Sequence, residues 1–167
     1  MNILCGMPGA IARRNRVSHN LLTSNQATGT DTLGDTTGFV QAAGATLSSS
    51  TDQVYQGSNS LKVVTTAALS NEGMGCNKTT TTPGLSDAAT VFVYAPLGAT
   101  LALYHLNSDW STAGSTSFTG TGAWQKVTNT ATPKAGSTGS YIQIFTVTTK
   151  QAITFYADAL KLQRIIP

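Results

Sequence analysis

Residues 100–106 read TLALYHL, and this stretch has the strictest two-residue alternation in the chain. In an extended strand, Leu101 and Leu103 fall on one side, while Ala102 and Tyr104 fall on the other. This alternation predicts a strand with one face against a core. Comparable runs, some alternating and some continuously apolar, occupy residues 39–47, 60–65, 89–94, 124–130, 141–147 and 153–162.

The spacing of these runs decides the fold class. Gly, Pro, Asn and Ser separate them, and most connections are too short for the helical crossovers that parallel strands require. At 167 residues, of which 40% are hydrophobic, the chain is long enough to bury one core. The sequence therefore predicts one all-β, antiparallel β-sandwich over residues 20–167, preceded by an extended basic arm over residues 1–19.

The positive charge of the chain lies in this arm. Arg13, Arg14 and Arg16 precede residue 20 without any acid, and the other seven basic residues balance seven acids, which leaves the net charge of +3 in the arm. Three arginines without interleaved aromatic residues are a weak nucleic-acid footprint, so nucleic acid is not an expected partner. Arginine also pairs with carboxylates, so we expect the arm to bind a protein surface.

The two cysteines and the N-terminal sequence indicate the cellular compartment in which the protein assembles. Cys5 and Cys76 are too few for a disulfide framework, which leaves either two free thiols or one bridge between arm and body. No stretch resembles a signal peptide, and no apolar run is long enough to span a membrane. We therefore expect assembly in a cytoplasm, without classical secretion and without a membrane partner.

Candidate catalytic residues are scattered. Glu72 is the only glutamate, whereas glycosidases need paired carboxylates in a cleft. His105 lies inside a predicted strand, and no Gly-x-Ser-x-Gly elbow, phosphate-binding loop or zinc spacing occurs. We expect no enzymatic activity.

Five short motifs resemble the jelly-roll carbohydrate-binding modules of the 4/9/22 kind, a domain type that also occurs in phage virion proteins. The resemblance covers about residues 20–163 and implies a jelly-roll sandwich. Its motifs are NLLT (20–23), STDQVYQGSNSLKV (50–63), VYAPLGATL (93–101), FTGTGAWQ (118–125) and TFYADALKL (154–162).

The resemblance also implies a structural calcium ion, held in part by an aspartate of the last strand. Asp158 matches that position, but residues 24–26 contain no acid at the first expected ligand position and Asp31 comes several residues late. The alternative is that Asp158 hydrogen-bonds a loop. No other cofactor is expected.

A glycan site would need exposed aromatic rings and polar groups beside them. The best candidates are Trp110, Tyr104 and Asn107, at the end of the 100–106 strand and in the following loop. Trp110 packing under its own loop or against a neighbouring subunit is the alternative. We expect Trp124 to fill the core and Tyr141 to be half-buried.

The arm and the sandwich together favour assembly over sugar binding. We expect a phage virion protein that decorates or cements the capsid, binds the major capsid protein or another virion protein, and forms a homo-oligomer. The alternative is a tail- or fibre-associated module that recognises host glycans.

Deletion of residues 1–19 tests the arm. The truncated chain should fold, because residues 20–167 contain all the predicted strands, and it should no longer bind capsids in a co-sedimentation assay. Undiminished capsid binding would contradict this role.

Overall fold

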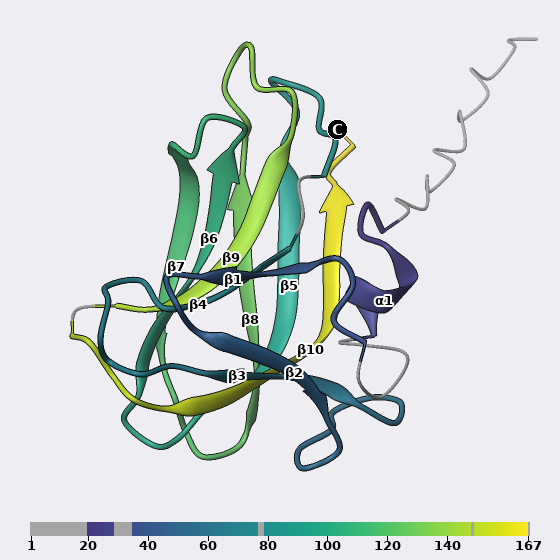
Figure 1. Ribbon diagram of the computed structural model, residues 1–167. Helices are drawn as coiled ribbons and strands as arrows, with labels where there is room; N and C mark the ends of the chain where they lie inside the picture. The colour runs from purple at the N-terminus through teal and green to yellow at the C-terminus, as the bar shows by residue number, and fades with distance from the viewer. Residues whose placement is uncertain (1–19, 29–34, 77–78, 148, 167) are drawn as a thin grey trace, which may run out of the picture.

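The computed structural model describes residues 20–28, 35–76, 79–147 and 149–166, and almost all of their regular structure is β-strand (Figure 1). Within these residues the elements are α1 (Ser24–Ala27), β1 (Phe39–Ala42), β2 (Thr46–Ser50), β3 (Ser60–Val64), β4 (Gly73–Cys76), β5 (Asp87–Tyr94), β6 (Thr100–Asn107), β7 (Thr112–Thr119), β8 (Trp124–Ala131), β9 (Ser140–Thr146) and β10 (Thr154–Arg164).

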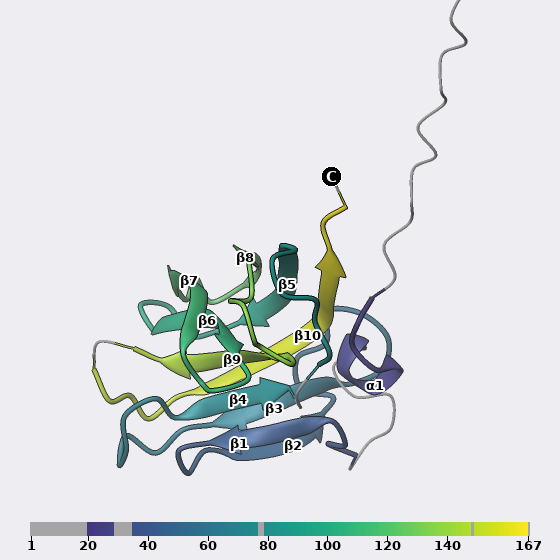
Figure 2. The same ribbon diagram turned by 90° about the horizontal axis from the view of Figure 1, so that it is seen from above.

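These strands form two five-stranded sheets that pack face to face. The sheet called the β9 sheet has the order β1-β4-β9-β6-β7, and the β10 sheet has the order β2-β3-β10-β5-β8. All the pairings between these strands are antiparallel. Figure 2 shows the two sheets running together from β1 and β2 at one edge to β7 and β8 at the other. The predicted antiparallel jelly-roll sandwich is confirmed, while the arm lies outside the described residues.

The core lies between the sheets and uses one side of each strand. Leu101 and Leu103 of β6 are fully buried, and Ile144 of β9 and Phe155 of β10 join them in one cluster. Burying such a side chain stabilises the fold by about 1.5–3 kcal/mol. Tyr104, which follows them, is only partly buried, as the predicted alternation requires, but Ala102 and Leu106 are buried as well, at 1% and 6% exposure.

Two expectations about local structure need correction. The run 39–47 is not one strand, because a turn with positive φ angles at Ala43 (49°) and Gly44 (87°) divides it into β1 and β2. Trp124 does not fill the core: it is half-buried and opposite Tyr94, on the outer side of the β10 sheet. Val127, three residues later, is in the core. Positions an odd number apart in a strand face opposite ways.

Cys76 is a buried free thiol at the end of β4. Burial raises the pKa of the Cys76 thiol to about 12, so this cysteine is inert at neutral pH. Cys5 lies outside the described residues, and the bridge between arm and body stays untested.

Candidate functional site

The loop that follows β6 has a fixed shape. Trp110 has a positive φ of 68°, a conformation that bulky residues rarely adopt. Its backbone N–H donates to the Asn107 carbonyl at 2.9 Å, and the Asn107 N–H donates to the Ser111 carbonyl at 2.8 Å. The Asn107 side chain closes the loop by donating from Nδ2 to Ser111 Oγ at 3.0 Å.

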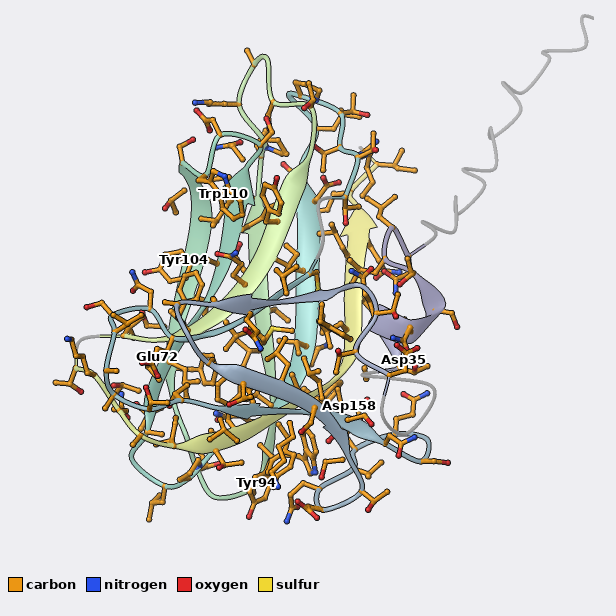
Figure 3. All side chains as sticks on the ribbon, in the orientation of Figure 1. Asp35, Glu72, Tyr94, Tyr104, Trp110 and Asp158 are labelled. Carbon is orange, nitrogen blue, oxygen red and sulfur yellow. The ribbon has the colours of Figure 1, made fainter. Side chains whose placement is uncertain are left out.

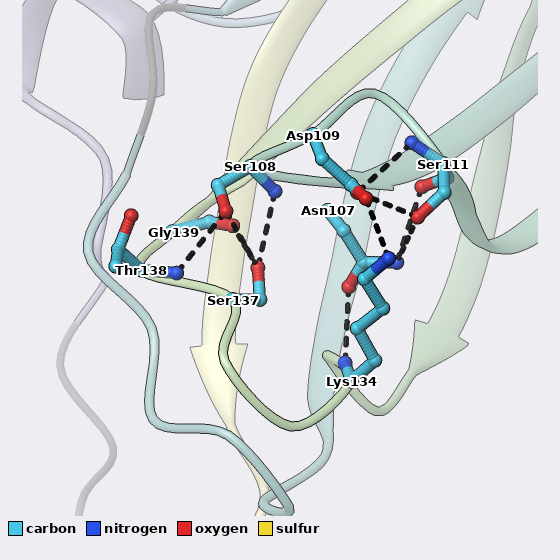
Figure 4. Close-up of polar contacts among 8 residues, drawn as sticks. All are labelled: Asn107, Ser108, Asp109, Ser111, Lys134, Ser137, Thr138 and Gly139. Carbon is cyan, nitrogen blue, oxygen red and sulfur yellow. Dashed lines mark hydrogen bonds and ion pairs between the residues drawn. The ribbon is translucent and has the colours of Figure 1, made fainter.

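A second loop, over residues 134–139, holds the first one in place (Figure 4). Asn107 Oδ1 accepts the Lys134 backbone N–H at 3.0 Å, and Lys134 Nζ pairs with Asp109 Oδ2 at 2.5 Å. The Ser108 N–H donates to Ser137 Oγ at 3.0 Å. Lys134 and Ser111 lower the pKa of Asp109 to about 2, so this carboxylate is charged throughout the neutral range.

The fixed loop presents the indole of Trp110. Its ring stacks on the ring of Tyr141 with centroids 4.1 Å apart and planes inclined by 10°. Trp110 is still 56% exposed. Because Tyr141 covers one face of the indole, the exposed area includes the other face.

A second aromatic pair lies on the same side of the β9 sheet. Tyr104 and Phe145 have ring centroids 5.1 Å apart. Tyr141 and Phe145 are four residues apart on β9, so both point outward and their Cα atoms are about 13 Å apart. In Figure 3, Tyr104 lies below Trp110. These four residues (Tyr104, Trp110, Tyr141 and Phe145) are called the β9-sheet aromatic face.

Small and polar residues flank this face. In register with Tyr104 lie Gln143 on β9 and the exposed Ser115 on β7. On the other side β4 contributes Gly75, where an added Cβ would meet the side chains of Gln143 and Val40 at 3.0 and 3.2 Å. The hydroxyl of Ser115 is therefore accessible beside the rings, whereas Gln143 is only 6% exposed. Directly after Phe145, a pocket is lined by Ser70, Asn71, Thr146, Val147, Thr149 and Lys150.

The predicted glycan residues have different roles in the structure. Trp110 and Tyr104 lie on one face, as a shared site requires. Asn107 is 3% exposed and its amide is used within the loops, so it positions the loop rather than offering a free group. Tyr141 is half-buried as expected, but its stack with Trp110 depends on tertiary contact that the sequence does not reveal.

Arg13, Arg14 and Arg16 lie outside the described residues. Their binding role, the virion location, the capsid partner and the homo-oligomer stay predictions from the sequence.

Glu72 holds a loop rather than facing a cleft. Glu72 is 1% exposed and accepts backbone N–H groups of Leu69, Thr66 and Ala67. The Leu69 and Thr66 hydrogen bonds lower the pKa of Glu72 to about 2. A general acid of glycoside hydrolysis needs a raised pKa, so Glu72 is unsuited to that role.

Asp158, which the resemblance assigns to a calcium site, uses both of its carboxylate oxygens to accept backbone N–H groups. Its Oδ2 accepts the N–H groups of Tyr55 and Gln56, each at 2.9 Å, and its Oδ1 accepts the Ala159 N–H at 2.6 Å. Calcium needs oxygen ligands whose lone pairs point at the ion. Within the described ranges no group of three or more His, Cys, Asp or Glu could hold a metal. The position matches the alternative, in which Asp158 anchors a loop.

Comparisons with known proteins support the fold. No protein-family model and no curated protein matches the sequence. Among solved structures, the chain is similar to the CBM22-1 xylan-binding domain of Xyn10C from Paenibacillus barcinonensis, with a TM-score of 0.68 and 15% identity over 90% of this chain and 97% of that one. The chain has the fold of a carbohydrate-binding module.

Two further similarities agree with this fold. The TmCBM61 structure in complex with β-1,4-galactotriose matches with a TM-score of 0.62 and 14% identity, over 89% of this chain and 100% of that one. An arabinose-bound GH51 α-L-arabinofuranosidase, MgGH51, matches with a TM-score of 0.71 and 13% identity over 88% of this chain, which spans 27% of the enzyme's length. The resemblance to jelly-roll carbohydrate-binding modules is thus confirmed for the fold.

Among the described residues, no helix is long and apolar enough to cross a membrane.

Proposed function

We propose that this domain binds glycans without catalysis, through the β9-sheet aromatic face. The observation that carries the proposal is the Trp110–Tyr141 stack, which leaves Trp110 56% exposed on a loop with a fixed shape. An exposed large aromatic residue in an uncommon backbone conformation is a feature that needs a reason, and binding sites are where such strain is found.

The spacing of the rings indicates an oligosaccharide rather than a single sugar. The Trp110–Tyr141 and Tyr104–Phe145 pairs are separated by four residues of β9, about 13 Å along the strand. Aromatic rings pack against the C–H face of a pyranose, while the exposed hydroxyl of Ser115 can hydrogen-bond its hydroxyls. The ion pair of Asp109 with Lys134 leaves no net charge beside Trp110, which favours a neutral chain.

The ligands named for similar solved structures support a choice of ligand class. One similar domain is named as xylan-binding and another holds β-1,4-galactotriose. We therefore propose a neutral β-1,4-linked polysaccharide as the ligand class. This role agrees with the alternative predicted from the sequence, a module that recognises glycans.

Replacing Trp110 with alanine should weaken glycan binding at least tenfold, about 1.4 kcal/mol, because one of the two stacking surfaces is lost. Isothermal titration calorimetry with β-1,4-xylohexaose and β-1,4-galactotriose measures the affinity of the parent and of the variant. The melting temperature should not change by more than a few degrees, since the indole is exposed.

The matched control is Ile166→Ala, which removes an apolar side chain of similar exposure, 47%, at the C-terminal end. Its affinity should equal that of the parent. A parent protein that gives no signal with either sugar or on a glycan array would reject the proposed function.

A further inference from the structure

Five aromatic side chains form a continuous patch on the outer side of the β10 sheet, opposite the β9-sheet aromatic face. Tyr55 stacks on Phe92 with centroids 3.7 Å apart and an inclination of 13°. Trp124 lies 5.7 Å from Tyr55 and 5.9 Å from Tyr94, and Tyr94 lies 6.1 Å from Tyr156. These residues are called the β10-sheet patch. Figure 3 places Tyr94 at the opposite end of the molecule from Trp110.

A buried acid holds the most exposed ring of this patch. Asp158 is fully buried and accepts the backbone N–H groups of Tyr55 and Gln56. Burial raises the pKa of Asp158, and the N–H groups of Gln56 and Tyr55 oppose this shift while they fix the loop between β2 and β3. Tyr55 is consequently held in place over Phe92 while remaining 44% exposed.

The rest of the patch is partly open, and lysines lie beside its rings. Phe92, Tyr94 and Trp124 are half-buried on neighbouring strands. At its edge, Lys62 Nζ pairs with Asp52 Oδ2 at 2.7 Å and lies 5.9 Å from the centre of the Tyr156 ring. Two further lysines lie on this side of the sheet: Lys126 is exposed on β8 in register with Phe92, and Lys161 is exposed on β10 in register with Thr90.

We propose that the β10-sheet patch is a second glycan-binding surface, which takes a neutral polysaccharide chain. Tyrosine and tryptophan combine an apolar ring with a polar group, which suits the C–H face and the hydroxyls of a pyranose. Tyr55, Trp124 and Tyr94 supply such rings side by side. The domain would then hold two chains on opposite sides of the sandwich. The inference rests on the proposed function for its ligand class only, since the two sites share no residue.

The chain contains two tryptophans, one on each side, so each site has its own fluorescent reporter. In Trp110→Phe the emission of Trp124 reports on the β10-sheet patch, and in Trp124→Phe the emission of Trp110 reports on the β9-sheet aromatic face. With β-1,4-xylohexaose, both variants should show a saturable change in emission. Adding Tyr55→Ala to Trp110→Phe should weaken the response of Trp124 at least tenfold, whereas adding Tyr55→Phe should preserve it.

The outcomes separate the two proposals. No response from Trp124, with a response from Trp110, overturns the second surface and leaves the proposed function standing. A response from Trp124 alone rejects the β9-sheet aromatic face and supports the second surface. If neither tryptophan changes its emission, both the proposed function and the second surface are rejected. If Tyr55→Ala instead converts a dimer into a monomer in analytical ultracentrifugation, the patch is a contact between copies and the second glycan surface is overturned. Circular dichroism melts of each variant check that it is folded.

Discussion

Replacing Gly73 with alanine should destabilise the domain by about 3 kcal/mol or more. A Cβ at this position would lie 1.9 Å from the carbonyl oxygen of Ile144 and 2.9 Å from the Cα of Phe145. Both atoms belong to the backbone of β9, so they cannot turn away as a side chain can. The methyl group would force β4 and β9 apart near Phe145, one of the proposed stacking rings.

Thermal unfolding measures this effect. For a domain of this size about 3 kcal/mol corresponds to a melting temperature about 6–12 °C lower. Gly75→Ala is the control on the same strand, because its Cβ would meet only the side chains of Gln143 and Val40, which can move. Gly75→Ala should lower the free energy of unfolding much less than Gly73→Ala. Equal melting temperatures for Gly73→Ala and the parent would show that β4 and β9 do not approach as closely as the structure has them.

The strand β4, which contains these two glycines, could not be predicted from the sequence. The run GMGC at residues 73–76 has alternating residues, but glycine is depleted in strands and the run is only four residues long. It was not among the expected strands. β7 was missed for a related reason: its outward Ser115 and Ser117 contrast little with its inward Gly114 and Thr116, so no two-residue apolar period stands out. By contrast, β6 was predictable because leucines alternate with other residues along it.

Part of the candidate site could also be predicted from the sequence. Trp110 and Tyr104 could be selected from the sequence because they are aromatic and lie beside one strand end. Their partners Tyr141 and Phe145 follow from the register of β6 against β9, in which Tyr104 is opposite Gln143. That register joins residues far apart in the chain, and no local pattern specifies it. The outward position of Trp124 could have been found from its odd spacing to Val127.

Acidification below neutral pH should destabilise the domain through His105. This residue is fully buried between the sheets, and neither of its ring nitrogens has a hydrogen-bond partner among the described residues. Burial lowers the pKa of His105 below its ordinary value of 6.5, while the charge of Asp87 opposes this shift less strongly. The unfolded chain therefore takes up a proton at a pH where the folded protein does not, so stability present above pH 6.5 is lost as the pH falls.

Urea unfolding measured from about pH 7.5 to about pH 4 tests this, and the unfolding free energy should fall by up to about 1.4 kcal/mol per pH unit below the unfolded pKa. His105→Gln cannot titrate, so its unfolding free energy should change less over this range, whatever its absolute value. Below pH 4.5 both proteins should lose stability, because the pKa of Glu72 is lowered from 4.5 to about 2 by its N–H donors. The same slope between pH 6.5 and 4.5 in His105→Gln and in the parent would show that another group, rather than the buried imidazole, makes the sandwich sensitive to acid.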